Sequence, residues 1–171
     1  IAFKNGGGIR DSILGPSIIR LTIQAALAFD NKLTVLEMTG DQVLAAMENS
    51  VSRVPALDGR FPQVAGVQMD YDATYQAIEG LPSVTVPSRV RNLTITKHDG
   101  TVVDMVVNGV ADPAALADTF VLATNSFTAT GGDGFAAFAA ATVMGATDTG
   151  EQAILEDYIS DFLGGTVDLP D

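Results

Sequence analysis

The sequence indicates a single α+β domain in which helices flank a mixed β-sheet. Apolar, strand-like runs alternate along the chain with segments of helical periodicity, which favours a sheet and helices packed on one core. Two strand-like runs flank an Asp-Gly turn, and such a hairpin makes the sheet at least partly antiparallel. The length of 171 residues fits one domain, and an apolar content of 47% is ample for its core.

Each expected element follows from a local pattern. In the first half of the chain we expect strands at residues 1–5, 32–40 and 66–72, helices at 17–28 and 41–54, and a loop at 54–64. Asp41 is the expected N-cap of the second helix. The apolar positions of that helix recur at helical spacing and therefore belong to the core: Val43, Leu44, Met47 and Val51.

In the second half, the hairpin consists of residues 89–96 and 101–107. A buried strand is expected at 119–127, followed by a helix from about 134 and an amphipathic helix at 151–163, which Gly164 and Gly165 end. His98 lies in the hairpin turn and is expected to be solvated.

Composition excludes several classes of function. The net charge of −12 repels phosphate backbones, so nucleic acid is not an expected partner. The chain has no cysteine and one histidine, which excludes thiolate and histidine-cluster metal sites. No apolar run approaches the ~20 residues that cross a bilayer, so no membrane span is expected. The chain opens inside a strand-like run without a leader, and we expect it to be the later part of a longer protein.

Two segments share one design: an apolar strand that runs into glycines and a charged residue. IAFKN leads into GGGIR, and FVLATN leads into SFTATGGDGF. Neither segment is a P-loop or a dinucleotide-binding fingerprint. Taken alone, both segments are compatible with tight turns that need positive φ. Since ligands collect at strand ends of sheets flanked by helices, they are also compatible with a binding site.

The residue types favour a site for a phosphorylated nucleoside. Arg10 can form paired hydrogen bonds to a phosphate or carboxylate, and Asp133 can accept hydrogen bonds from a pair of sugar hydroxyls. Phe29 and Phe127 can stack on the two faces of a base, although either ring alone is also compatible with core packing.

Several motifs occur in an order that resembles a known family. They are NGGGIR at 5–10, AFDN at 28–31, TG at 39–40, GRFPQVAG at 59–66, YD at 71–72 and NSFTATGGDGF at 125–135. Together they resemble the C-terminal domain of the 5′-nucleotidase family, and the resemblance spans nearly the whole chain. That family includes ecto-5′-nucleotidases, UDP-sugar hydrolases and 2′,3′-cyclic-nucleotide phosphodiesterases.

The resemblance implies a division of labour. In the family, an N-terminal metallophosphoesterase domain holds two divalent metal ions and carries out hydrolysis, while the C-terminal domain binds the nucleotide and delivers it by a domain rotation. Residues 1–171 are therefore expected to be the nucleotide-binding domain, truncated at its N-terminal side, without cofactor and inactive alone. The expected partners are a nucleotide or nucleoside and the catalytic domain of the same polypeptide. The resemblance also implies a periplasmic or extracellular location.

The resemblance also assigns roles to residues. Phe29 and Phe127 match the phenylalanines that sandwich the base, and Asp133 matches the aspartate that binds the ribose. The other matching positions contact the substrate or allow close backbone approach: Asn5, Gly7, Gly8, Arg10, Asn31 and Gly132.

The chain departs from the family pattern where AFDN replaces PFGN, since Asp30 adds a negative charge beside the expected base site. Arg60 is interpreted as part of a structural loop rather than as a phosphate ligand. Two alternatives to an enzyme's substrate domain stay open. One is a non-catalytic nucleoside-binding module, and the other is a stable fragment without a competent site.

Overall fold

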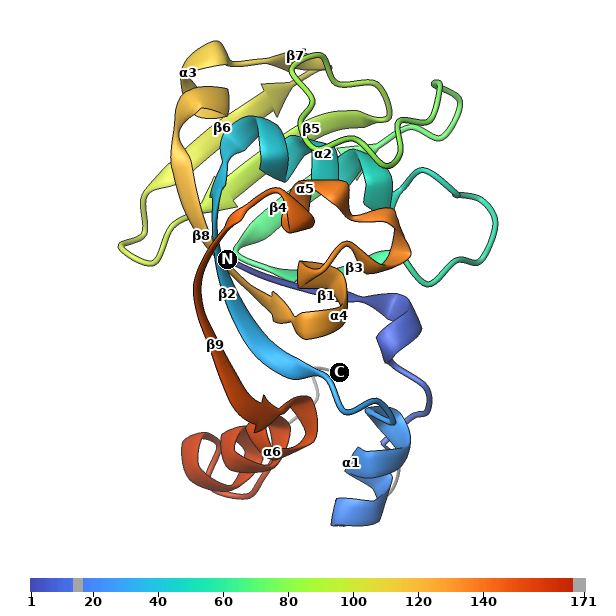
Figure 1. The fold of residues 1–171 in the computed structure, drawn as a ribbon, viewed down its shortest axis with the longest axis vertical. Coiled ribbons are helices and arrows are strands. Elements are labelled where there is room, and N and C mark those ends of the chain that lie inside the picture. Colours follow the sequence, from blue (N-terminus) through green and yellow to red (C-terminus); the bar gives the residue numbers. More distant parts are fainter. Residues whose placement is uncertain (14–16, 168–171) are drawn as a thin grey trace.

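The computed structural model describes residues 1–13 and 17–167 and contains two sheets. The five-stranded sheet has the order β3-β1-β8-β2-β9, and the four-stranded sheet has the order β4-β5-β6-β7. The strands are β1 (Ala2–Asn5), β2 (Lys32–Thr39), β3 (Pro62–Ala65), β4 (Val67–Tyr71), β5 (Val90–Thr96), β6 (Val102–Val107), β7 (Val110–Ala111), β8 (Thr119–Asn125) and β9 (Thr142–Gly150). Figure 1 shows their arrangement.

The helices are short. They are α1 (Arg20–Ala26), α2 (Gly40–Ser50), α3 (Pro113–Ala117), α4 (Ser126–Ala129), α5 (Ala136–Ala139) and α6 (Glu151–Asp157). Two 3₁₀ turns, η1 (Gly6–Gly8) and η2 (Gly132–Gly134), follow the glycine-rich strand ends, and a π-helical turn, η3 (Tyr158–Phe162), follows α6. None of the helices in the described residues is both long enough and apolar enough to cross a membrane.

The five-stranded sheet is mixed, as expected. Strands β1 and β8 pair in parallel, whereas β1 with β3, β2 with β8 and β2 with β9 are antiparallel. The predicted hairpin is present as β5 and β6, closed by a turn in which Gly100 has φ 83°. His98 is exposed in that turn, as predicted.

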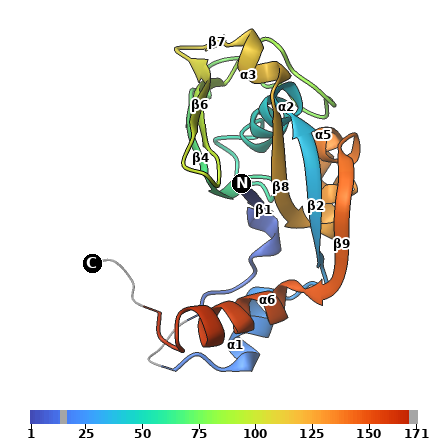
Figure 2. The same cartoon turned by 90° about the vertical axis from the view of Figure 1, so that its left-hand side faces the viewer.

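The core joins both sheets through α2, which lies between them in Figure 2. The apolar residues predicted on this helix are fully buried: Val43, Leu44, Met47 and Val51. A second part of the core is aromatic, since the ring of Phe3 meets those of Phe135 and Phe138 edge-on at 4.9 and 5.0 Å between centroids. This cluster packs β1 against residues 135–138, which follow β8 in the sequence.

Several element boundaries differ from the prediction. Helix α2 begins at Gly40, and its N-cap is Thr39, because the Thr39 and Gln42 side chains form a reciprocal capping box; the prediction of Asp41 as the cap was wrong. Residues 62–64 were expected in a loop but belong to β3, because they pair with β1. Strand β8 ends at Asn125, and the short helix α4 begins at Ser126, within the strand expected at 119–127.

Strand β9 was not predicted. Its residues, TVMGATDTG, combine small and polar types and expose every position from Thr142 to Thr149, so the sequence carries no apolar alternation there. Pairing with β2 defines it instead.

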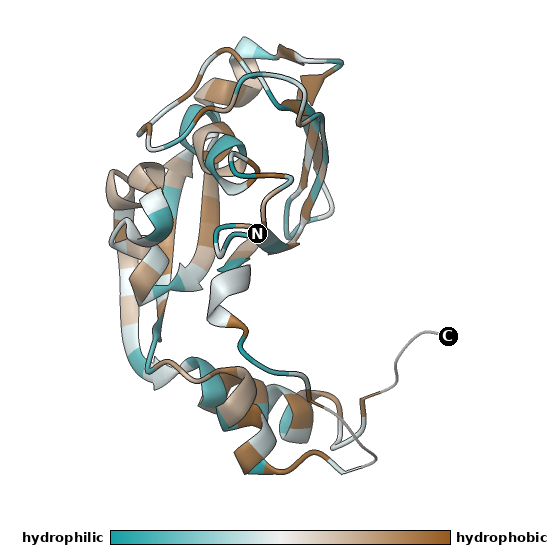
Figure 3. Ribbon diagram, turned by 90° about the vertical axis from the view of Figure 1, so that its right-hand side faces the viewer, coloured by the Kyte–Doolittle hydropathy of each residue, from teal (hydrophilic) through white to brown (hydrophobic). Residues whose placement is uncertain are grey.

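Helices α1 and α6 pack together at the lower end of the molecule, and Figure 3 shows mixed hydrophilic and hydrophobic colouring along both. Arg20 on α1 forms an ion pair with Glu156 at 2.9 Å, and the Gln152 side chain donates to the Leu27 carbonyl at 2.7 Å. These contacts fix the chain between α1 and β2, which carries Phe29 and Asn31.

Candidate functional site

The two glycine-rich segments come together because the strands before them are parallel neighbours. Strand β1 runs into η1, and β8 runs into α4 and then η2. A pocket of about 290 Å³ lies at this end of the sheet, and it is lined by Asn5, Gly7, Gly8, Arg10, Phe29, Asn31, Gly59, Phe127 and Asp133. All the site residues predicted from the sequence line it except Gly132, and Gly59 is an addition.

The aromatic part of the pocket lining is open to solvent, and we call Phe29 and Phe127 the aromatic wall. Phe29 is 48% exposed and Phe127 is 43% exposed. Gly132 lies against the Phe127 ring, since a Cβ built on it would lie 2.5 Å from a ring atom. The Arg10 guanidinium lies 5.9 Å from the centroid of the Phe29 ring. Large apolar rings left in water at a concave site are typical of a surface that binds a planar group.

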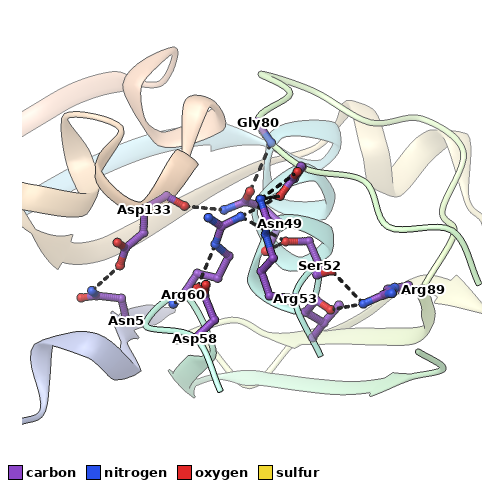
Figure 4. Close-up of polar contacts among 11 residues, drawn as sticks. Asn5, Asn49, Ser52, Arg53, Asp58, Arg60, Gly80, Arg89 and Asp133 are labelled. Atoms are coloured by element: carbon purple, nitrogen blue, oxygen red, sulfur yellow. Dashed lines mark hydrogen bonds and ion pairs between the residues drawn. The ribbon is translucent and has the colours of Figure 1, made fainter. Parts of the chain in front are cut away.

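The polar part of the pocket lining is more buried, and we call Asn5 and Asp133 the polar wall. Asn5 is 3% exposed, and its Nδ2 donates to Asp133 Oδ2 at 2.7 Å (Figure 4). Asp133 adopts the left-handed backbone region, at φ 56° and ψ 23°, which aspartate tolerates better than most residues. Asn49 Nδ2 donates to the Asp133 carbonyl at 3.2 Å, so both the backbone and the side chain of Asp133 are held.

The glycine triplet brings two segments of the chain together. The Gly7 N–H donates to the Gly59 carbonyl at 2.8 Å, and a Cβ on Gly7 would lie 2.8 Å from the Gly59 Cα. Positive φ occurs instead in the second segment, at Gly131 (91°) and Gly134 (78°). The first segment is therefore glycine-rich for close packing, and the second for turn geometry.

Asn31 lines the pocket and contacts a pair of charged side chains. Its Nδ2 donates to Glu151 Oε2 at 3.4 Å, and Lys4 Nζ lies 2.7 Å from Glu151 Oε1. Asp30 forms an ion pair with Lys32 and lies outside the pocket lining. The negative charge expected from Asp30 beside the base site is thus offset by a neighbouring ammonium.

Arg60 does not line the pocket, and its side chain forms ion pairs within the protein. Its guanidinium lies 3.0 Å from Asp58 and 2.9 Å from Glu79, and its side chain is 17% exposed (Figure 4). These ion pairs tie the loop that carries Gly59, as the structural interpretation of Arg60 requires.

Sequence reasoning missed Gly59 and the buried Asn125, whose Nδ2 donates to Asn5 Oδ1 at 3.2 Å. Both lie inside quoted motifs, GRFPQVAG and NSFTATGGDGF. Gly59 approaches Gly7 across a long separation in sequence, and no local spacing indicates that contact. Across residues 1–13 and 17–167, no group of three or more His, Cys, Asp or Glu side chains is placed to hold a metal ion.

Comparison with known proteins identifies relatives. The chain is 32% identical over 142 residues to the trifunctional nucleotide phosphoesterase protein YfkN of Bacillus subtilis, covering 83% of this chain and 8% of that protein. It is 28% identical over 134 residues to protein UshA of Escherichia coli, covering 78% of this chain and 19% of UshA. The chain therefore spans less than a fifth of the length of either relative.

A solved structure, the 5′-nucleotidase precursor from Thermus thermophilus, matches with a TM-score of 0.78 at 31% identity, over 94% of this chain and 28% of that one. The family model described as the 5′-nucleotidase C-terminal domain matches residues 1–140, which include both glycine-rich segments and every residue of the pocket. The chain therefore belongs to the 5′-nucleotidase C-terminal domain family.

Proposed function

We propose that this chain is the substrate-binding domain of a two-metal 5′-nucleotidase-type phosphohydrolase and that the pocket binds the base and ribose of a nucleotide. The observation that carries the proposal is that Phe29, Phe127 and Asp133, which lie far apart in the sequence, line one pocket. Its volume of about 290 Å³ is close to the lower end of the range usual for small-molecule sites.

The aromatic wall provides the base site. Phe29 comes from the segment before β2 and Phe127 from α4, so the two rings are carried by separate elements. Stacking of a base on an aromatic side chain contributes ~1–3 kcal/mol. Because stacking depends on π surface rather than on a particular hydrogen-bond pattern, this wall accepts purines and pyrimidines.

The polar wall provides the ribose site. Asp133 Oδ2 accepts from Asn5, and the carboxylate has further lone pairs with which to accept from a pair of ribose hydroxyls. Arg10 is exposed at the rim, where its guanidinium can bind a phosphate. The Arg10 guanidinium donates to the Gly7 carbonyl at 3.3 Å and forms no ion pair with any of the described residues, so a ligand phosphate would meet a cation without a carboxylate partner.

The described residues do not fit a metal centre, so we assign no bond-breaking step to this chain. Its contribution to hydrolysis is positioning, since a held base and ribose place the phosphate in one geometry. We assign the two divalent metal ions to an N-terminal catalytic domain of the same polypeptide, in the periplasm or outside the cell.

Equilibrium titration of the chain with adenosine and AMP tests the proposal. Phe127→Ala should weaken adenosine binding about fivefold or more, because one stacking face is lost. Phe162→Ala is the matched control, since Phe162 is 77% exposed and lies outside the pocket lining. Unchanged affinity in Phe127→Ala would remove Phe127 from the site.

The same titration separates the alternatives. If the unsubstituted chain binds neither ligand, the alternative of a stable fragment without a competent site is favoured. Binding by the chain, together with a full-length polypeptide that does not hydrolyse AMP in the presence of divalent cations, would favour a non-catalytic binding module. Hydrolysis by the full-length polypeptide, and hydrolysis about fivefold slower or more in Phe127→Ala at subsaturating AMP, is the result we expect.

A further inference from the structure

We propose that Asn125 is a positioning residue that acts through Asn5 to fix the carboxylate of Asp133 in the orientation that accepts ribose hydroxyls. This inference deepens the proposed function and rests on it. Asn125 does not line the pocket, is 3% exposed, and has no role in the assignments made above from sequence.

The three residues form a chain of hydrogen bonds between the ends of the two parallel strands. Asn5 is the last residue of β1, and Asn125 is the last residue of β8. Asn125 Nδ2 donates to Asn5 Oδ1 at 3.2 Å, and Asn5 Nδ2 donates to Asp133 Oδ2 at 2.7 Å. The chain of contacts thus runs from a fully internal position to the wall of the pocket.

The contact between Thr128 and Asn125 determines the direction of the other hydrogen bonds in this series. The backbone N–H of Thr128 can only donate, and it donates to Asn125 Oδ1 at 2.9 Å. This contact fixes the Asn125 amide and directs its NH₂ group to Asn5. Asn5 must then present its carbonyl to Asn125 and its NH₂ to Asp133. The carboxylate of Asp133 therefore meets a donor with a single orientation.

Asn125 has a second role, which makes a selective test available. It is the N-cap of α4, because its Oδ1 accepts from the N–H of Thr128. Aspartate caps a helix as well as asparagine does but has no N–H to donate. Asn125→Asp thus keeps the cap and removes the hydrogen bond to Asn5. The Asn5 amide then turns its NH₂ toward residue 125 and its carbonyl toward Asp133, which repels the carboxylate from its present position.

The experiment measures the affinities of the 171-residue chain for adenosine and 2′-deoxyadenosine. In the unsubstituted chain, adenosine should bind about tenfold more tightly or better, as expected for a hydrogen bond to a charged group. In Asn125→Asp this ratio should fall toward one, while the affinity for 2′-deoxyadenosine stays within about twofold of its original value. A purely structural role would weaken both ligands equally and leave the ratio unchanged.

The matched control is Asn92→Asp in the four-stranded sheet. Asn92 makes a comparable pair of contacts at a more exposed position, since its Oδ1 accepts from the Asn108 N–H at 2.9 Å and its Nδ2 donates to the Asp70 carboxylate at 3.1 Å. It adds the same charge away from the pocket and should keep the original ratio. If Asn125→Asp does not fold by circular dichroism, Asn125→Ser replaces it, because serine keeps a capping oxygen and lacks the amide that reaches Asn5.

The outcomes distinguish this inference from the function on which it rests. If the unsubstituted chain binds neither nucleoside, the proposed function is wrong. A chain that binds both equally removes the ribose role of Asp133, and this inference with it, and leaves base stacking in place. A substituted chain that folds, binds and keeps the original ratio overturns the role of Asn125 alone.

Discussion

The two walls of the pocket are built in opposite ways. The aromatic wall consists of rings that are 43–48% exposed, whereas the polar wall is anchored by Asn5 and Asn125, each 3% exposed. The aromatic rings lose solvent contact only when a ligand covers them. The carboxylate of Asp133 is already oriented by the hydrogen bond from Asn5 without any ligand. If the pocket binds a nucleotide as proposed, its ribose side is pre-organised, and its base side is buried only when the ligand binds.

The largest effect should come from breaking the polar wall, which serves both folding and binding. Asn5→Ala leaves the Asn125 amide without its acceptor and Asp133 without its donor. A buried polar group left unpaired costs about 1–3 kcal/mol, so the free energy of unfolding should fall by about that amount in urea denaturation. Asn92→Ala, at a partly exposed position of the four-stranded sheet, should cost less. Equal losses in the two variants would show that burial at Asn5 carries no special weight.

Breaking the aromatic wall should alter binding and spare the fold. Phe29→Ala removes a half-exposed ring, so its unfolding midpoint should change little, while adenosine affinity should fall by about 1–3 kcal/mol. Uridine should lose less affinity than adenosine, because its smaller base overlaps the ring less. Titrations with both nucleosides check this prediction. A stability loss as large as that of Asn5→Ala would mean that Phe29 belongs to the core instead.

The contact between Gly132 and Phe127 gives a smaller and more selective perturbation. In Gly132→Ala the new Cβ would lie 2.5 Å from ring atoms of Phe127, so the ring must move and adenosine affinity should fall by less than in Phe127→Ala. Gly145→Ala is the control, because a Cβ there meets nothing within 4 Å. Competition titration against adenosine measures the difference. Unchanged affinity in Gly132→Ala would indicate that the ring position is not critical.

The smallest effect concerns a group outside both walls. A hydrogen bond from the Lys97 side chain, at 2.6 Å, and one from the Thr119 N–H hold the pKa of Asp118 below its usual value. A lowered folded-state pKa stabilises the protein above the unfolded-state pKa, near 3.8, and this contribution is lost as the pH falls through the folded-state value. Asp118→Asn should therefore lower the melting temperature slightly at pH 7, and the difference should vanish in strong acid. Nucleoside affinity should not change; a change would connect this ion pair to the pocket.

The sequence predicted the fold where patterns were local. The apolar spacing of α2 and the Asp-Gly turn between β5 and β6 each determine one element, and both are present. Strand β9 was missed because its residues have no apolar alternation and only pairing with β2 defines it. The N-cap of α2 was placed at Asp41 because two capping residues lie close together, and only the reciprocal bond with Gln42 selects Thr39.

For the candidate site, motif order identified residues that the structure gathers in one pocket, but it did not indicate how they are held. Gly59 reaches Gly7 from a distant loop, and Asn125 reaches Asn5 from a neighbouring strand. Both contacts depend on the parallel pairing of β1 with β8 and on the antiparallel pairing of β1 with β3. Such pairings join residues that are far apart in the chain, so no short-range pattern contains them.

The most direct measurement is the set of nuclear Overhauser effects between adenosine and the aromatic side chains of the chain in solution. If the two rings clamp the base, the H2 and H8 protons of adenine should show contacts to the ring protons of both Phe29 and Phe127. Contacts to other aromatic side chains, with none to these two in a sample saturated with adenosine, would contradict the proposed site.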